Sequence, residues 1–390
     1  MKRFFPVLFL IAACASNPNQ PATAPSTMKV GNYTADVGPT PVGVIPVAKL
    51  RDPARNKELE ISIEYPTRGG PFPVIIFSHG YGSSDRAYEP LISYWTSNGY
   101  VCMRPAHADA GQLREPSRDT GVAPPSGAQS RRRPQQQGRA IPLQQNNPAE
   151  QIWDREREPQ WQARVADVAM VINALDGLER DYPELAGKMD HNKVGVAGHG
   201  YGAFTAMLIG GMRTFGNPPL QLGDPRVRAI EAFSPEGAAE NRGTNAQSWA
   251  GVRIPVLFMT GTNDRGATEA EDAHWRKQAF DYSAAGDKYF VLIDGARYAS
   301  FTGQVGFYAM EPTTTPTMAT DPYGRPIVQQ PQQQPRGAMV FGSDRQNFNV
   351  VKITSLAFWD AYLKNDTTAR ELLQPQKYES SFTAAHMSAK

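Results

Sequence analysis

The chain has few of the features that would assign it to several common protein classes. Its 390 residues include only 2 cysteines, so a small fold held together by disulfides is excluded. The 40 basic and 38 acidic residues nearly balance, and we predict no nucleic-acid partner. No span beyond the N-terminal region approaches the ~18 continuous apolar residues of a membrane-spanning helix. The chain is long enough to be stabilised by its own core.

The N-terminal segment has the pattern of an export signal. Lys2 and Arg3 precede an apolar run at 4–13, and small residues lead directly to Cys14. A charged region, an apolar region and a small-residue cleavage site together predict a signal peptide over residues 1–13. Cys14 then resembles the lipidated first residue of a bacterial lipoprotein, which implies a membrane anchor through lipid. The alternative is an ordinary signal peptide with a chance cysteine. Ala15 carries no obvious inner-membrane retention signal, which favours an outer-membrane anchor facing the periplasm.

Composition divides the rest of the chain into a tether, one domain and a tail. Residues 14–40 are rich in Pro, Ala, Ser and Asn, which is typical of a flexible tether. Residues 41–366 are predicted to form a single domain, and residues 367–390 a C-terminal tail. Gln- and Pro-rich stretches at about 108–160 and 303–349 are predicted insertions, because they lie between core elements.

Within the domain, strand patterns alternate with helix patterns. Strands are predicted at 59–65, 72–78, 100–104, 193–197, 227–233, 256–260 and 289–293, and helices at 88–98, 161–178, 203–212 and 350–364. This alternation predicts an α/β fold with a mostly parallel central sheet and helices on both faces.

A glycine occupies the position where a nucleophile would be expected. Residues 194–207 read as a short strand, a tight glycine turn and an apolar helix. This is the context of a nucleophile elbow, whose pattern is G-x-S-x-G. Here Gly198 and Gly202 flank Gly200, so the turn is present and the serine is absent.

Four segments carry a resemblance to a known superfamily: residues 77–84, 198–203, 260–266 and 294–301. Over roughly residues 45–366 the chain resembles α/β-hydrolases, and among them the bacterial dienelactone hydrolases and the platelet-activating-factor acetylhydrolase-like esterases. The resemblance implies an α/β-hydrolase fold and a Ser–Asp–His triad with an oxyanion hole.

Two of the three implied triad positions hold unsuitable residues. Gly200 stands at the nucleophile position, and Tyr298 at that of the histidine base. A phenol, with a pKa of about 10, is a poor general base near neutral pH, although it can donate a hydrogen bond, for instance to Asp264. Asp264 fits the implied acid; the alternative is a turn or helix-capping aspartate.

The implied oxyanion hole is still present. Its two donors would be the backbone N–H groups of Tyr81, after the His79-Gly80 pair, and of Tyr201, directly after the elbow position. Neither donor depends on its side chain. The alternative is that these glycine-rich segments simply make turns.

Other residues could substitute for the missing groups. His107 and Asp109 leave a strand at its carboxyl end, where ligands bind in open α/β sheets. His107 could be a general base paired with the Asp109 carboxylate, or the two could be half of a metal site, but two ligands are too few for zinc. The favoured interpretation is a structural or substrate-contacting His107, with His79 and Asp109 as the other candidate pocket residues. We therefore predict neither a metal nor a cofactor. The alternative nucleophiles in principle are Ser83, Ser84, Ser234 and Cys102.

Two hypotheses follow. In the first, the protein is a catalytically degenerate esterase that binds an ester-like or lipid-like ligand, or a partner, without turnover. In the second, it is an active ester or lactone hydrolase with a relocated nucleophile or base, such as Ser83 or His107.

Overall fold

The computed structural model describes residues 29–111, 157–215, 219–303, 319–320, 326–327 and 337–390. The predicted signal peptide and Cys14 lie outside the described residues, as do the middles of both predicted insertions. None of the helices in the described ranges combines the length and apolar character needed to cross a membrane.

Nine of the strands in the described residues form one sheet, in the order β13-β10-β9-β8-β7-β5-β6-β4-β3. Their bounds are β3 Val42–Asp52, β4 Lys57–Pro66, β5 Phe72–Ser78, β6 Val101–Pro105, β7 Met189–His199, β8 Val227–Phe233, β9 Val256–Gly261, β10 Lys288–Ile293 and β13 Ala385–Ala389. The run from β6 to β10 is parallel, whereas β3, β4 and β13 pair antiparallel with their neighbours.

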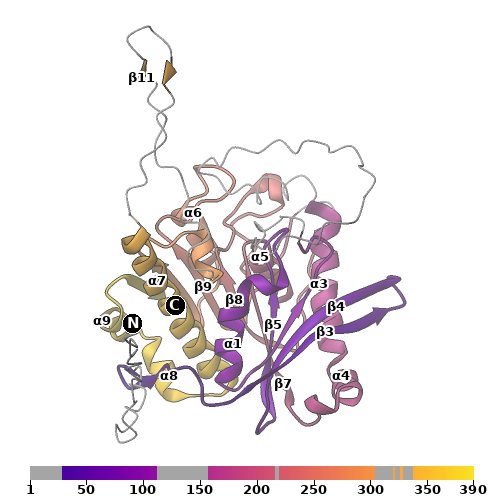
Figure 1. Ribbon diagram of the computed structural model, residues 1–390. Coiled ribbons are helices and arrows are strands. Elements are labelled where there is room, and N and C mark those ends of the chain that lie inside the picture. Colours follow the sequence, from indigo (N-terminus) through magenta and orange to yellow (C-terminus); the bar gives the residue numbers. More distant parts are fainter. Residues whose placement is uncertain (1–28, 112–156, 216–218, 304–318, 321–325, 328–336) are drawn as a thin grey trace, which may run out of the picture.

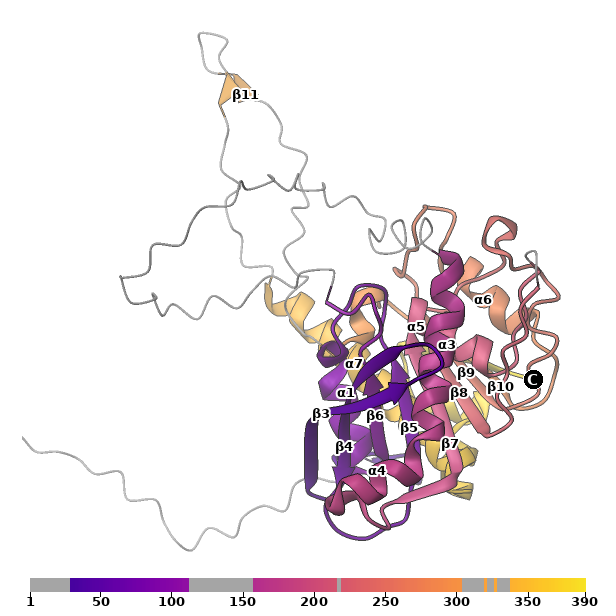
Figure 2. The same ribbon diagram turned by 90° about the vertical axis from the view of Figure 1, so that its right-hand side faces the viewer.

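Helices cover both faces of this sheet (Figures 1 and 2). The α-helices are α1 Glu89–Ser97, α3 Arg157–Asn173, α4 Leu175–Asp181, α5 Tyr201–Ile209, α6 Ala273–Asp281, α7 Gly337–Leu363, α8 Thr367–Leu372 and α9 Pro375–Ser381. Short 3-10 turns are η1 Asp85–Tyr88, η2 Pro183–Leu185, η3 Glu240–Arg242 and η4 Tyr298–Phe301, and two-residue ribbons pair β1 Lys29–Val30 with β2 Tyr33–Thr34 and β11 Ala319–Thr320 with β12 Pro326–Ile327.

The central strands are buried on both faces. Val74 and Ile76 of β5 belong to the core cluster that includes α3 and α5, whereas Ile75 and Phe77 belong to the cluster that includes α1 and α7. A continuous apolar run is what such a strand requires, because alternate side chains point to opposite faces. The α/β-hydrolase fold and the mostly parallel sheet predicted from the sequence are thereby confirmed.

The long edge strand β3 was not predicted from the sequence. It contains Gly43 and Pro46, two residues that weaken a strand prediction. It lies at the edge of the sheet and has a register irregularity between Ile45 and Ala48. An edge position and a bulge are the places where a strand tolerates proline.

The predicted tether and tail are both partly wrong. Within the predicted tether of 14–40, residues 29–34 form a small hairpin, and the Tyr33 hydroxyl donates to Asp360 on α7 at 2.5 Å. The predicted tail of 367–390 forms α8, α9 and β13, which extends the sheet beside β10. Both segments pack because their apolar residues fill gaps beside α7.

The predicted insertions are shorter than expected at their C-terminal ends. α3 begins at Arg157, inside the predicted insertion of 108–160, and α7 begins at Gly337, inside that of 303–349. The helix predicted at 161–178 also divides at Ala174, where α3 ends and α4 begins.

Glu231 is a charged residue type in the middle of the core. It lies on β8, is fully buried, and neither carboxylate oxygen has a hydrogen-bond partner among the described residues. Burial raises the pKa of Glu231 well above its ordinary value of 4.5. The folded protein therefore holds this side chain in its neutral form over a wide pH range.

We expect Glu231 to make the protein less stable as pH rises. Above the ordinary pKa the unfolded chain loses the proton and the folded chain keeps it, so unfolding becomes easier by about 1.4 kcal/mol per pH unit until the raised pKa is reached. Glu231→Gln should remove this slope. Urea unfolding at about pH 5 and about pH 8 measures how the free energy of unfolding depends on pH. The same dependence for the native protein and for Glu231→Gln would contradict the expectation.

Candidate functional site

The elbow is formed by the junction of β7 and α5. β7 ends at His199, Gly200 takes φ +54° and ψ −113°, and α5 begins at Tyr201. The Gly200 N–H donates to the Phe233 carbonyl of the neighbouring strand at 2.9 Å. A non-glycine residue would be strained in this conformation by about 1–3 kcal/mol, and glycine adopts it without that cost.

The two flanking glycines have a packing role of their own. A Cβ at Gly202 would overlap the carbonyl oxygen of Ser78, and a Cβ at Gly198 would overlap the backbone of Gly202. The first turn of α5 can lie against the end of β5 only because both positions lack a side chain. The G-x-x-x-G frame is thus required by the fold, whatever stands at its centre.

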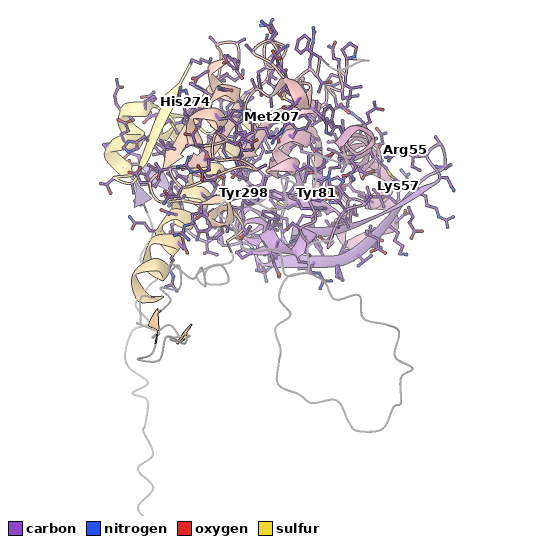
Figure 3. All side chains as sticks on the ribbon, turned by 90° about the horizontal axis from the view of Figure 1, so that it is seen from above. Arg55, Lys57, Tyr81, Met207, His274 and Tyr298 are labelled. Atoms are coloured by element: carbon purple, nitrogen blue, oxygen red, sulfur yellow. The ribbon has the colours of Figure 1, made fainter. Side chains whose placement is uncertain are left out.

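Tyr298 fills the space above Gly200. It is the first residue of η4, in the loop that follows β10. A Cβ at Gly200 would overlap the Tyr298 Oη and would lie 2.8 Å from its Cζ. The sequence placed both residues in one site; the structure brings them into contact. The labelled side chain of Tyr298 is seen from above in Figure 3.

His199 lies directly beneath this tyrosine. Its ring centroid is 4.0 Å from that of Tyr298, and its Nδ1 is 2.8 Å from the Tyr88 hydroxyl. The Tyr88 oxygen in turn accepts from the Gly80 N–H at 3.2 Å. Burial, with a smaller contribution from Arg276, lowers the pKa of His199 to about 3. His199 is therefore neutral and acts as a packing platform for Tyr298.

Asp264 is held by groups other than Tyr298. Its Oδ2 accepts from the Thr260 hydroxyl at 2.8 Å, and its Oδ1 lies 3.2 Å from the Arg276 Nε, an ion pair that is not aligned as a hydrogen bond. Both side chains of the pair are fully buried. Among the described residues Tyr298 is not a partner of Asp264, so the hydrogen bond considered from the sequence is not formed. Arg276, on α6, was missed because no motif marks it.

The two residues of the implied oxyanion hole lie side by side. The ring centroids of Tyr81 and Tyr201 are 6.0 Å apart. Arg164, on α3, places its guanidinium 4.4 Å from the centre of the Tyr201 ring and donates to the His79 carbonyl at 2.7 Å. The loop that would supply the first donor is thus held against the elbow helix.

The pair of His107 and Asp109 that the sequence allowed is not formed. Asp109 accepts from the guanidinium of Arg164 at 2.6 and 3.1 Å and from the Gly82 N–H at 2.7 Å. His107 instead has Asp167 as its carboxylate partner, at 3.0 Å from Nδ1. Asp109 is closer to His107 in sequence, but its carboxylate is already paired with the buried Arg164.

His107 joins a serine to this carboxylate. Its Nε2 is 2.9 Å from the Ser78 Oγ, and Asp167 also accepts from Lys57 and Arg55 at 2.7 and 2.8 Å. Ser78, His107 and Asp167 thus follow one another in the hydrogen-bond order of a serine triad. All three are buried. Ser78 and Asp167 were missed because no elbow or spacing marks them.

The charges of this network are set by burial and by its arginine. Burial, reinforced by Arg164, lowers the pKa of His107 to about 4, and that of His79 well below its ordinary value. For Asp109 and Asp167 burial acts in the opposite direction. The charges of Arg164 and His79 nevertheless lower the pKa of Asp109 to about 2. His107 and Lys57 lower the pKa of Asp167 to about 2 in the same way.

We expect His107 to make the protein sensitive to acid. Between its ordinary pKa of 6.5 and its folded value of about 4, the unfolded chain binds a proton that the folded chain does not. Stability should fall by about 1.4 kcal/mol per pH unit as pH decreases through this window. His107→Gln should reduce that dependence in urea unfolding, and His274→Gln, at an exposed position, should leave it unchanged. Equal slopes for both variants would contradict the expectation.

The alternative nucleophiles have ordinary roles or poor access. The Ser84 hydroxyl accepts from the Arg86 N–H at the start of η1, and Ser83 lies half-buried beside it. Ser234 is buried with φ +49°. Cys102 is a buried free thiol whose pKa is raised to about 12 by burial. The described residues contain no group of three or more His, Cys, Asp or Glu that could hold a metal ion.

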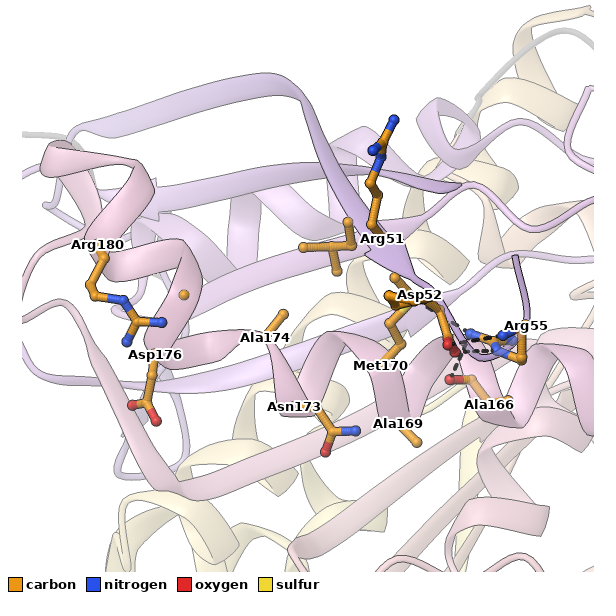
Figure 4. Close-up of a pocket in the computed structure, with 13 residues that line it drawn as sticks. Arg51, Asp52, Arg55, Ala166, Ala169, Met170, Asn173, Ala174, Asp176 and Arg180 are labelled. Atoms are coloured by element: carbon orange, nitrogen blue, oxygen red, sulfur yellow. Dashed lines mark hydrogen bonds and ion pairs between the residues drawn. The ribbon is translucent and has the colours of Figure 1, made fainter. Parts of the chain in front are cut away.

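A groove of about 760 Å³ lies elsewhere on the molecule. It runs between β3, α3 and α4 and is lined by charged residues of both signs, including Arg51, Asp52, Arg180 and Asp176 (Figure 4). None of the sequence-predicted site residues lines it. Arg55, at one end, is already paired with Asp52 and Asp167.

Comparison with known proteins found one family model that matches the N-terminal part of the chain. The family model described as Chlorophyllase, an α/β-hydrolase-like family, matches residues 28–116. This span runs from β1 to just beyond β6 and includes the loop of Tyr81, but it ends before the elbow. It supports an esterase-like scaffold. No curated protein matches the chain.

Proposed function

We propose that this protein is a degenerate esterase: an α/β-hydrolase scaffold that binds an ester-like or lipid-like ligand, or a partner, without turning it over. The observation that carries the proposal is the overlap of the Tyr298 Oη with the position of a side chain at Gly200. A serine at position 200 would require the Tyr298 side chain to move out of this space. Asp264, in the implied acid position, forms an ion pair with Arg276. The implied base position holds Tyr298, so it provides no imidazole for Asp264 to orient.

Steady-state hydrolysis tests this proposal. The purified full chain should release p-nitrophenolate from short p-nitrophenyl esters without sustained turnover. Gly200→Ser with Tyr298→His should gain turnover, because the two substitutions place a hydroxyl and an imidazole at the implied nucleophile and base positions. Sustained turnover by the native protein would overturn the proposal.

The second candidate is an active esterase with a relocated triad, and one observation favours it. Ser78, His107 and Asp167 are connected at 2.9 and 3.0 Å, and the Arg164 Nη1 lies 3.3 Å from the Ser78 Oγ, where it would stabilise an alkoxide. Against it, Ser78 is fully buried. A fluorophosphonate adduct on Ser78, lost in Ser78→Ala, would establish this function instead.

We further propose that the protein is exported and anchored to the bacterial envelope through lipid on Cys14, at the outer membrane. The support is the sequence from Lys2 to Cys14. Because residues 29–34 are folded against the domain, the tether would be shorter than the sequence suggested. Radiolabelled palmitate should enter the native protein, and Cys14→Ser should abolish both labelling and membrane association.

A further inference from the structure

The Tyr298 hydroxyl stands where a nucleophile on the elbow would stand. A Cβ at Gly200 would overlap the Tyr298 Oη, which is closer to it than the Cζ at 2.8 Å. A serine hydroxyl would extend only one bond beyond that Cβ. The elbow therefore still presents a hydroxyl at its tip, supplied by the loop after β10 instead of by the elbow.

The Tyr298 hydroxyl also lies close to the loop after β5. A Cβ at Gly80 would lie 3.2 Å from the Tyr298 Oη. Gly80 directly precedes Tyr81, whose backbone N–H is one implied oxyanion donor, and Gly200 directly precedes Tyr201, which carries the other. The phenolic oxygen thus lies close to both of the segments that would bind an acyl group.

The tyrosine is held in this position by its surroundings. Its ring packs on His199, and the neighbouring Phe301 is fully buried and packs against the same histidine at 5.8 Å. The Arg297 N–H donates to the Ser300 Oγ at 3.0 Å, and the Ser300 N–H donates to the Arg297 carbonyl at 2.9 Å, which fixes the start of η4. Tyr298 itself is only half-buried. A hydroxyl fixed beside a binding site loses little freedom when it reacts.

The local charge favours an anionic oxygen. The Arg276 guanidinium lies 5.9 Å from the centre of the Tyr298 ring, and the N-terminus of α5 begins directly after Gly200. Arg276 is paired with Asp264, so the helix N-terminus supplies the partial positive charge that stabilises the oxyanion formed during attack.

We propose that Tyr298 is an acyl acceptor: it takes one acyl group from an activated ester and keeps it as an O-acyl-tyrosine. The Tyr298 Oη attacks the carbonyl carbon, the new C–O bond forms, and the bond to the leaving oxygen breaks. The phenolic proton passes to water, and the leaving group departs as its anion. Tyrosine is among the side chains that form such covalent intermediates.

The leaving group determines which donors can react. Transfer to a phenol is favourable when the departing oxyanion is a weaker base than phenolate, as p-nitrophenolate is. Alkoxides are stronger bases than phenolate, so ordinary alkyl esters should not acylate Tyr298. The ligand class is therefore an aryl ester or a comparably activated acyl or phosphyl donor.

This inference rests on the proposed absence of turnover. No histidine stands at position 298, and the neutral His199 lies under the ring of Tyr298. Neither arrangement activates water against an acyl-tyrosine, so the adduct should persist and the reaction should stop at one equivalent.

The experiment uses the full chain, purified in detergent, with p-nitrophenyl acetate. We expect a burst of one equivalent of p-nitrophenolate, one added acetyl group by intact mass, and peptide mapping of that group to Tyr298. Hydroxylamine should release it, as it releases an aryl ester and not an amide. Tyr298→Phe, which keeps the ring on His199, should reduce the burst about tenfold or more.

The matched control is Tyr282→Phe, because Tyr282 is 38% exposed and lies outside the site. Its burst should equal that of the native protein. An acetyl group on Tyr282, on Ser78 or spread over lysines would overturn the inference, as would the absence of a burst. Continuous turnover would instead overturn the proposed function, so the two failures are distinguishable. Mapping on the native protein keeps the result decisive even if Tyr298→Phe misfolds.

Discussion

Gly200→Ser alone should destabilise the protein strongly, and Tyr298→Ala should rescue it. The serine would take a backbone conformation that strains it by about 1–3 kcal/mol, and its Cβ would overlap the Tyr298 Oη. Overpacking of this kind adds about 1–3 kcal/mol. We therefore expect a loss of about 2–6 kcal/mol in the free energy of unfolding, of which the second substitution restores the overpacking part, about 1–3 kcal/mol, as coupling energy.

Gly187→Ser is the control for this cycle. Gly187 also has a positive φ, +69°, but no atom lies within 4 Å of its Cβ position. This variant should show the backbone cost alone, and Tyr298→Ala should not rescue it. Urea unfolding of the single and double variants measures all the terms. Additive effects at positions 200 and 298 would show that the two residues do not compete for one space.

Asp264→Asn should also cost about 3–5 kcal/mol, because it leaves the buried Arg276 without its counter-charge. Both side chains of this pair are fully buried. Replacing the two together, as Asp264→Leu with Arg276→Met, should recover most of the loss, since no buried charge then remains. Asp264 would thus be a structural residue in a position that the family implies for catalysis.

The surface pair of Asp224 and Arg226 gives a matched comparison. Its closest distance is 2.6 Å, and its side chains are 12% and 43% exposed. Asp224→Asn should cost about 1 kcal/mol or less. Thermal and urea unfolding compare the two variants directly. If Asp264→Asn were as mild as Asp224→Asn, the charge of Asp264 would contribute little to the fold.

The strands that could be predicted are those whose environment is uniform. β5 and β8 were both predicted with their observed bounds: β5 is an apolar run buried on two faces, and β8 is buried apart from Arg228, although it also contains Glu231. β3 and β13 were missed because edge strands carry mixed patterns that also suit loops. The sequence cannot show that residues 385–389 lie beside β10, since that pairing depends on the packing of α8 and α9 around α7.

The sequence could indicate which residues belong to the candidate site, but it could not show which of them touch. Motif spacing placed Gly200, Asp264 and Tyr298, but it could not show that the tyrosine reaches over the glycine. Nor could it identify Arg276, whose only signal is burial. His107 illustrates the same limit, because its partner Asp167 is 60 residues away in sequence, beyond an insertion.

Because Gly202 packs on the Ser78 backbone, the shape of the elbow is constrained independently of any catalytic residue at its centre. Substitution at Gly198 or Gly202 would disrupt the backbone of two strands and a helix, whereas the centre of the motif faces only a side chain. The presence of such a glycine motif therefore indicates the fold more reliably than it indicates catalytic activity. In a collection of related chains, the residues at positions 200 and 298 would separate two groups: serine with histidine would mark the implied triad, and glycine with tyrosine would mark the degenerate site that we propose.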